Sequence, residues 1–99
     1  MPRIFDTLTA RILPDDRIVT VKGRDAWALR NLVSAGPVGC TPIDQPGPRW
    51  AHYVFKLRRS GLIIETIEEK HGGPYAGTHA RYVLRTQVEV VEERGRAAA

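Results

Sequence analysis

The sequence predicts an α+β fold in which helices precede a β-hairpin, and three patterns carry this prediction. Apolar side chains recur at helical spacing within residues 24–35 and again within 48–60. A β-branched run at 62–69 and a second extended segment at 80–85 flank a glycine-rich stretch. Glycine and proline stand between these segments, where they end helices and form turns. A chain of 99 residues is the size of one small domain with one core.

The two ends of the chain show weaker patterns. Residues 1–15 have no sustained period, and Pro14-Asp15-Asp16 favours a turn, so we expect an arm there. Ile18–Val21 is a short β-branched run that predicts a strand. Val88-Glu89-Val90 alternates as strands do and is expected to pair with that run, although a fraying helix fits the same residues. We therefore divide the chain into an N-terminal arm, a folded domain and a flexible tail, at residues 1–15, 16–91 and 92–99.

The first helix is expected over residues 24–35. Asp25 lies in the first turn, where the helix dipole favours an acid, and Gly36-Pro37 ends the pattern. Trp27 points away from the apolar stripe, so it either packs under the N-terminal arm or is exposed. The stripe, which predicts the buried face, consists of Ala26, Leu29, Leu32 and Val33.

A second, very short helix is expected to begin at Thr41. Thr41 can cap the first free amides, Pro42 suits the first helical position, and Asp44 stands where a capping-box acid would reach back. Pro46-Gly47-Pro48 follows at once, and the residue before a proline is disfavoured in a helix. This helix is therefore limited to about one turn. Pro48 then begins a third helix, which runs to Ser60.

The third helix, 48–60, has one apolar and one basic face at about 100° per residue. Trp50, Val54 and Leu57 share the apolar face, with Tyr53 at its edge. Residues 49–60 include no acid, so the net charge of +4 is concentrated in this helix. This favours a surface that binds a polyanion, and a solvated helical face is the alternative. The basic face carries Arg49, His52, Lys56 and Arg59, while Arg58, near the buried edge, is expected to pair with an acid or a phosphate.

The hairpin is expected to run out over 62–69, turn through 70–79 and return over 80–85. Glycines in the tip permit backbone conformations that other residues rarely adopt, so the tip can follow a curved polyanion. An ordinary hairpin turn is the alternative interpretation. Hydrogen-bond donors and one aromatic side chain stand around the tip, namely Lys70, His71, Tyr75, His79 and Arg81.

Several kinds of chemistry are not expected from this sequence. Cys40 is the only cysteine, which excludes an internal disulfide and a cysteine-based zinc site. The histidines lack short ligand spacing, and no nucleophile has an identifiable base, so we expect no metal, no cofactor and no enzymatic activity. No run approaches the roughly 20 apolar residues of a spanning helix, which predicts no membrane partner. A cytoplasmic protein fits these observations best.

The order helix, short helix, basic helix and glycine-tipped hairpin resembles a winged helix-turn-helix domain of the small bacterial or phage type. The resemblance covers about residues 18–86 and is sharpened by Tyr53–Gly61 and by His79–Leu84. It implies a three-helix core with a helix-turn-helix and a C-terminal β-hairpin wing. It also implies that helix 48–60 enters the major groove, with the 68–81 wing on the backbone or minor groove. One departure is the short second helix, which bears on how deeply the next helix docks.

The function expected from this resemblance is non-enzymatic binding of double-stranded DNA by a small transcriptional regulator, associated with the nucleoid. A protein–protein interaction module is the alternative, with the basic face on an acidic protein partner and self-association into a homodimer. RNA binding by the same face is a further alternative. The residues expected to contact DNA are Arg49, His52, Tyr53, Lys56, Arg59, Thr41 and Gln45, together with Lys70, His71, Tyr75, His79 and Arg81 of the wing.

Overall fold

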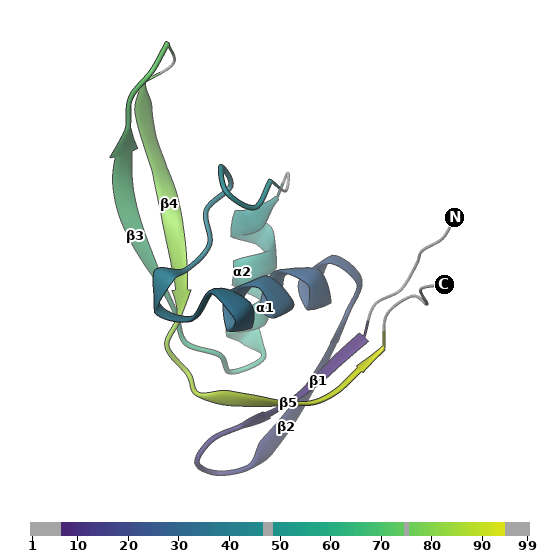
Figure 1. Cartoon of the computed structure of the whole chain (residues 1–99). Helices are drawn as coiled ribbons and strands as arrows, with labels where there is room; N and C mark the ends of the chain where they lie inside the picture. The colour runs from purple at the N-terminus through teal and green to yellow at the C-terminus, as the bar shows by residue number, and fades with distance from the viewer. Residues whose placement is uncertain (1–6, 47–48, 75, 95–99) are drawn as a thin grey trace, which may run out of the picture.

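In a computed structural model, which describes residues 7–46, 49–74 and 76–94, two α-helices pack between a three-stranded sheet and a long hairpin (Figure 1). The hairpin and the sheet lie at opposite ends of the molecule. The elements in chain order are β1 Thr7–Ile12, β2 Arg17–Lys22, α1 Gly23–Ala35, the 3-10 turn η1 Gly36–Val38, α2 Trp50–Arg59, β3 Ile64–His71, β4 Gly77–Leu84 and β5 Val88–Arg94.

The three-stranded sheet is antiparallel, with β1 between β2 and β5. Its central strand lies within the segment expected to be an arm, so that expectation is wrong for residues 7–12. Leu8, Ala10 and Ile12 alternate with polar residues and are buried, which is the pattern of a strand with one face on the core. Residues 1–6 and 95–99 of the expected arm and tail lie outside the described residues.

The strand predicted at 18–21 is confirmed as β2, but its partner is β1. The strand predicted at 88–90 is also present and extends to Arg94, into the segment expected to be the tail. The predicted direct pairing of these two strands is wrong, because β1 lies between them and bonds to both. The sheet therefore contains both predicted strands, with β1 between them.

The first helix forms as predicted, and Ala26, Leu29 and Leu32 face the core. Trp27 lies between the helices, with its ring centroid 5.3 Å from that of Trp50. The Arg24 guanidinium carbon stands 5.0 Å over the Trp27 ring. Trp27 is therefore partly covered by α2 and by its own helix. Residues 1–6 of the arm that the sequence suggested as its cover lie outside the described residues.

Thr41 starts a single turn and not a second α-helix. Thr41 Oγ1 accepts hydrogen bonds from the amides of Ile43 and Asp44, at 3.2 and 2.9 Å. The side chain that reaches back to the Thr41 amide is that of Gln45, at 3.0 Å, and not Asp44. Residues 7–46, 49–74 and 76–94 contain two α-helices, so the predicted three-helix core does not form. Side chains within the turn accept the hydrogen bonds of the Thr41, Ile43 and Asp44 amides, so these amides are satisfied without a longer helix.

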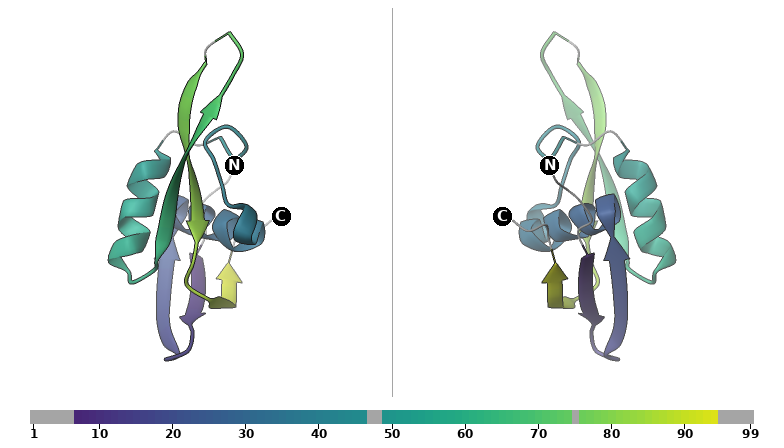
Figure 2. Two further views of the ribbon diagram at one scale, coloured as in Figure 1. Left: turned by 90° about the vertical axis from the view of Figure 1, so that its left-hand side faces the viewer. Right: turned by 90° about the vertical axis from the view of Figure 1, so that its right-hand side faces the viewer.

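The hairpin strands β3 and β4 pair in register from Ile64 opposite Leu84 to His71 opposite Gly77. The strands therefore continue through much of the segment that the sequence assigned to the tip. In both views of Figure 2 the hairpin extends past the N-terminal end of α2. The segment that connects α1 to α2 also bonds to the hairpin. The backbones of Cys40, in this segment, and Tyr82, on β4, exchange two hydrogen bonds of 2.8 Å.

Gly39 makes this connection possible, and we predict that Gly39→Ala destabilises the protein by about 1–3 kcal/mol. Its backbone has a φ of 79° and a ψ of −177°, a region almost reserved for glycine. An added Cβ would also lie 2.6 Å from the carbonyl oxygen of Tyr82. Urea unfolding of the two proteins measures the loss. A Gly39→Ala protein as stable as the wild type would show that this backbone geometry is not required.

Candidate nucleic-acid interface

The position of α2 is fixed by its buried face. Trp50 is buried, and its indole nitrogen donates a 2.7 Å hydrogen bond to the carbonyl oxygen of Gln45. The Trp50 ring stacks on Tyr82 of β4 with centroids 5.8 Å apart. Val54 and Leu57 continue the buried stripe, as the sequence predicted. The helix is therefore held against both α1 and the hairpin.

Two basic side chains along the flanks of α2 bind neighbouring elements. Lys56 Nζ lies 2.9 Å from the carboxylate of Asp25 on α1. Arg58 donates to the carbonyl oxygen of Ile64 at 3.1 Å and to Thr66 Oγ1 at 2.9 Å, both on β3. Arg58 therefore bonds to β3 and not to an acid in the described part of the chain, and the expected contact with a phosphate stays a prediction. These two contacts fix which face of the helix points outward.

The surface that we call the basic face consists of Arg49, which directly precedes α2, and of His52, Phe55 and Arg59 within the helix. All four side chains are exposed. In the described part of the chain no ion pair joins Arg49 or Arg59 to an acid. The Arg59 guanidinium carbon stands 5.8 Å from the centroid of the Phe55 ring. Phe55 was not among the predicted contacts, although a phenylalanine outside the apolar stripe is a visible signal.

Two of the predicted DNA contacts outside the wing, Tyr53 on α2 and Thr41 in the turn before it, are core residues. Tyr53 is 5% exposed and packs edge-on against Trp27 and Trp50. Thr41 is 1% exposed and its hydroxyl caps the turn. Both are buried and are therefore removed from the predicted contacts. Gln45 is half-buried, with its side-chain oxygen bound to the Thr41 amide, and it supports the start of α2.

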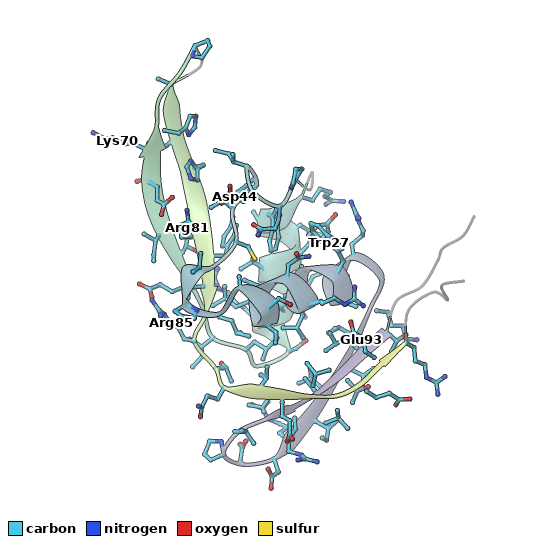
Figure 3. The ribbon with its side chains drawn as sticks, viewed as in Figure 1. Trp27, Asp44, Lys70, Arg81, Arg85 and Glu93 are labelled. Carbon is cyan, nitrogen blue, oxygen red and sulfur yellow. The ribbon has the colours of Figure 1, made fainter. Side chains whose placement is uncertain are left out.

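The wing residues divide into an exposed lysine and a bonded cluster. Lys70 is exposed and projects away from the hairpin (Figure 3). Arg81 Nε lies 2.5 Å from Glu69 Oε2, and another Arg81 nitrogen donates to the carbonyl oxygen of Val38 at 3.0 Å. His79 Nε2 lies 3.0 Å from Glu69 Oε1, and His79 Nδ1 lies 2.9 Å from His71 Nδ1. This Glu69 cluster braces the hairpin against η1. Tyr75 lies outside the described residues.

The charge state of Glu69 depends on this cluster. The hydrogen bond from Arg81 is the main cause that lowers the pKa of Glu69, and His79 adds to the effect, while desolvation opposes it. The same bond raises the pKa of Arg81. Glu69 is therefore held in its charged form, where it accepts from both side chains.

We predict that acid weakens the wild type more than it weakens Glu69→Gln. The pKa of Glu69 is lower in the folded than in the unfolded chain, so its contribution is complete above the unfolded value of about 4.3. That contribution is lost as the pH falls through the folded pKa. Urea unfolding of both proteins between about pH 6 and pH 3 measures the difference. Parallel pH profiles for the two proteins would contradict the assignment.

The described residues contain no group of three or more His, Cys, Asp or Glu side chains arranged to hold a metal ion. Burial raises the pKa of the Cys40 thiol to about 11, opposed by the nearby Arg81 charge. Cys40 is a packed core residue, whose backbone bridges to β4. Among the helices that the structure describes, none is long and apolar enough to cross a membrane.

The geometry combines an exposed basic helix with a β-hairpin beside it, which is the arrangement of a winged helix. Comparison with known families agrees, because the winged helix domain family matches residues 18–94. The chain belongs to that family, which confirms the resemblance seen in the sequence. Such domains are in general DNA-binding modules and are typically not enzymes. No curated protein and no solved structure gives a significant match.

Proposed function

We propose that this protein binds double-stranded DNA through the basic face of α2. The observation that carries the proposal is that Arg49, just before the first turn of α2, and Arg59, in its last turn, are exposed and form no ion pair with an acid among the described residues. Neighbouring Lys56 and Arg58 are bound to α1 and β3, so the basic face is also held in one orientation. A helix held in one orientation, with arginines that pair with no acid among the described residues, is suited to a partner with dense negative charge.

Duplex DNA fits this surface in shape and in charge. Its major groove is about 12 Å wide and admits an α-helix. Each arginine that neutralises a phosphate releases condensed counterions, which gives affinity that does not depend on sequence. Arginine can also bind guanine with two hydrogen bonds. His52 lies between Arg49 and Arg59 along the helix and can donate to a phosphate or a base edge.

The hairpin supplies the second contact. It extends past the N-terminal end of α2 (Figure 2), and Lys70 is its exposed cation. We assign Lys70 to the DNA backbone beside the groove that α2 occupies. The Glu69 cluster has a structural role in this proposal. Arg81 and His79 both bond to Glu69 and so stabilise the pairing of β3 with β4. His71, which contacts His79, belongs to the same brace.

A domain of this size that binds DNA without catalysis is suited to transcriptional regulation, by occupying a site that other proteins need. We therefore assign the protein to the small regulators of bacteria or their phages, acting at the nucleoid in the cytoplasm. The exposed arginines support DNA binding directly and a regulatory role only as a consequence of it. The identity of the binding partner is therefore tested first.

A competition assay tests the proposal against its two alternatives. Labelled duplex DNA is bound to the protein, and unlabelled duplex DNA, duplex RNA and polyglutamate are then added in separate titrations. We expect duplex DNA to compete best, because the deep, narrow major groove of A-form RNA does not admit a helix. Stronger competition by RNA would favour RNA binding, and stronger competition by polyglutamate would favour an acidic protein partner. Either result would reject the proposal.

A further inference from the structure

Phe55 is a large apolar side chain in the middle of the basic face, and it is 55% exposed. Its neighbours one turn away are His52 and Arg59, and Ala51 is also exposed there. We infer that Phe55 contacts the C5-methyl group of a pyrimidine in the major groove, which in unmodified DNA is thymine. The inference rests on the proposed function and adds a sequence preference to it.

The position of Phe55 around the helix supports this role. At about 100° per residue, Phe55 lies roughly opposite Leu57, which is fully buried. The flanking contacts of Lys56 with α1 and of Arg58 with β3 keep this side outward. Phe55 therefore lies on the part of α2 that reaches deepest into a groove, beyond the arginines that serve the phosphates.

The chemistry of the groove selects the ligand. Thymine is the unmodified base that presents a methyl group in the major groove, and phenylalanine is one of the side chains that contact it. Arg59 stands over the Phe55 ring and restrains it through a cation–π contact. The ring is thereby held beside a cation that can bind the adjacent phosphate or a guanine. Burial of one methyl group corresponds to about a fourfold change in affinity.

The test removes the methyl group from the DNA and the ring from the protein. The wild-type protein first selects duplexes from a random pool, and each thymine of the selected site is then replaced in turn by deoxyuridine. We expect deoxyuridine to weaken wild-type binding about fourfold at one or two positions. Phe55→Ala is expected to bind the thymine and deoxyuridine duplexes equally. Val91→Ala, which shortens an exposed apolar side chain on β5, is the control and should keep the wild-type ratio.

Replacing the same base by 5-methylcytosine, with guanine opposite, separates the two sources of the methyl group. If the wild type binds the 5-methylcytosine duplex more tightly than the unmodified cytosine duplex, and Phe55→Ala does not, the result supports a contact with the methyl group of either base. Wild-type protein that binds its selected site but does not distinguish thymine from deoxyuridine at any position would overturn the inference and leave DNA binding intact. Discrimination that persists in Phe55→Ala would also overturn it. Failure to bind any duplex would instead reject the proposed function, and the inference with it.

Discussion

Arg49→Ala and Arg59→Ala together are expected to weaken duplex DNA binding by roughly 50- to 100-fold near 0.1 M salt. Each phosphate contact contributes about 0.9 to the slope of log affinity against log salt concentration, so loss of two contacts lowers that slope by about 1.8. Both side chains are exposed on the basic face, so their removal should leave the fold unchanged. Fluorescence anisotropy with a labelled duplex at several salt concentrations measures affinity and slope together.

The matched control removes two arginines from the other side of the core. Arg11 and Arg94 lie on the sheet, where they pair with Glu89 and Glu92. Arg11→Ala with Arg94→Ala changes the net charge by the same amount as the first variant. We expect a much smaller loss of affinity from the control pair. Equal losses for the two pairs would mean that net charge, and not the basic face, determines binding.

Trp50→Ala is expected to lower the free energy of unfolding by about 3–5 kcal/mol. The Trp50 ring contacts Trp27 of α1, Tyr53 of α2 and Tyr82 of β4, so its loss leaves a cavity where three elements meet. The hydrogen bond to the Gln45 carbonyl is lost as well. Domains of this size have a total stability of about 5–15 kcal/mol, so the variant should be close to unfolding. Urea denaturation followed by circular dichroism measures the change.

Phe55→Ala is the control for this variant, because it removes an aromatic ring from the same helix at an exposed position. We expect a change within about 0.5 kcal/mol. A loss from Trp50→Ala that is no larger than that of the control would show that Trp50 does not join the helices and the hairpin.

The helices and the hairpin could be predicted because their information is local. Helical spacing identified the buried side of both α-helices, and Gly61 marked the step from α2 to β3. The strand β1 was missed because its partners β2 and β5 decide it, and β5 lies at the far end of the chain. Its buried positions include Ala10, a small residue that gives little apolar signal.

The candidate site was predicted in part for similar reasons. The exposure of Arg59 follows from the helical period, but the burial of Tyr53 at the stripe edge depends on Trp27 from another helix. Arg81 and His79 were assigned to DNA by residue type. Their actual partner, Glu69, is brought opposite His79 by the strand register, which residue type alone does not reveal. Side chains that act through tertiary partners need the structure.

The most direct test of DNA binding by the basic face is a map of the contact surface. Uniformly ¹⁵N-labelled protein is titrated with duplex DNA, and the amide chemical shifts are followed residue by residue. We expect the largest changes along α2, around His52, Phe55 and Arg59, with smaller changes at Lys70 on the hairpin. The outer face of the three-stranded sheet should change little. Shifts confined to that sheet, or no shifts at low salt, would contradict the proposal.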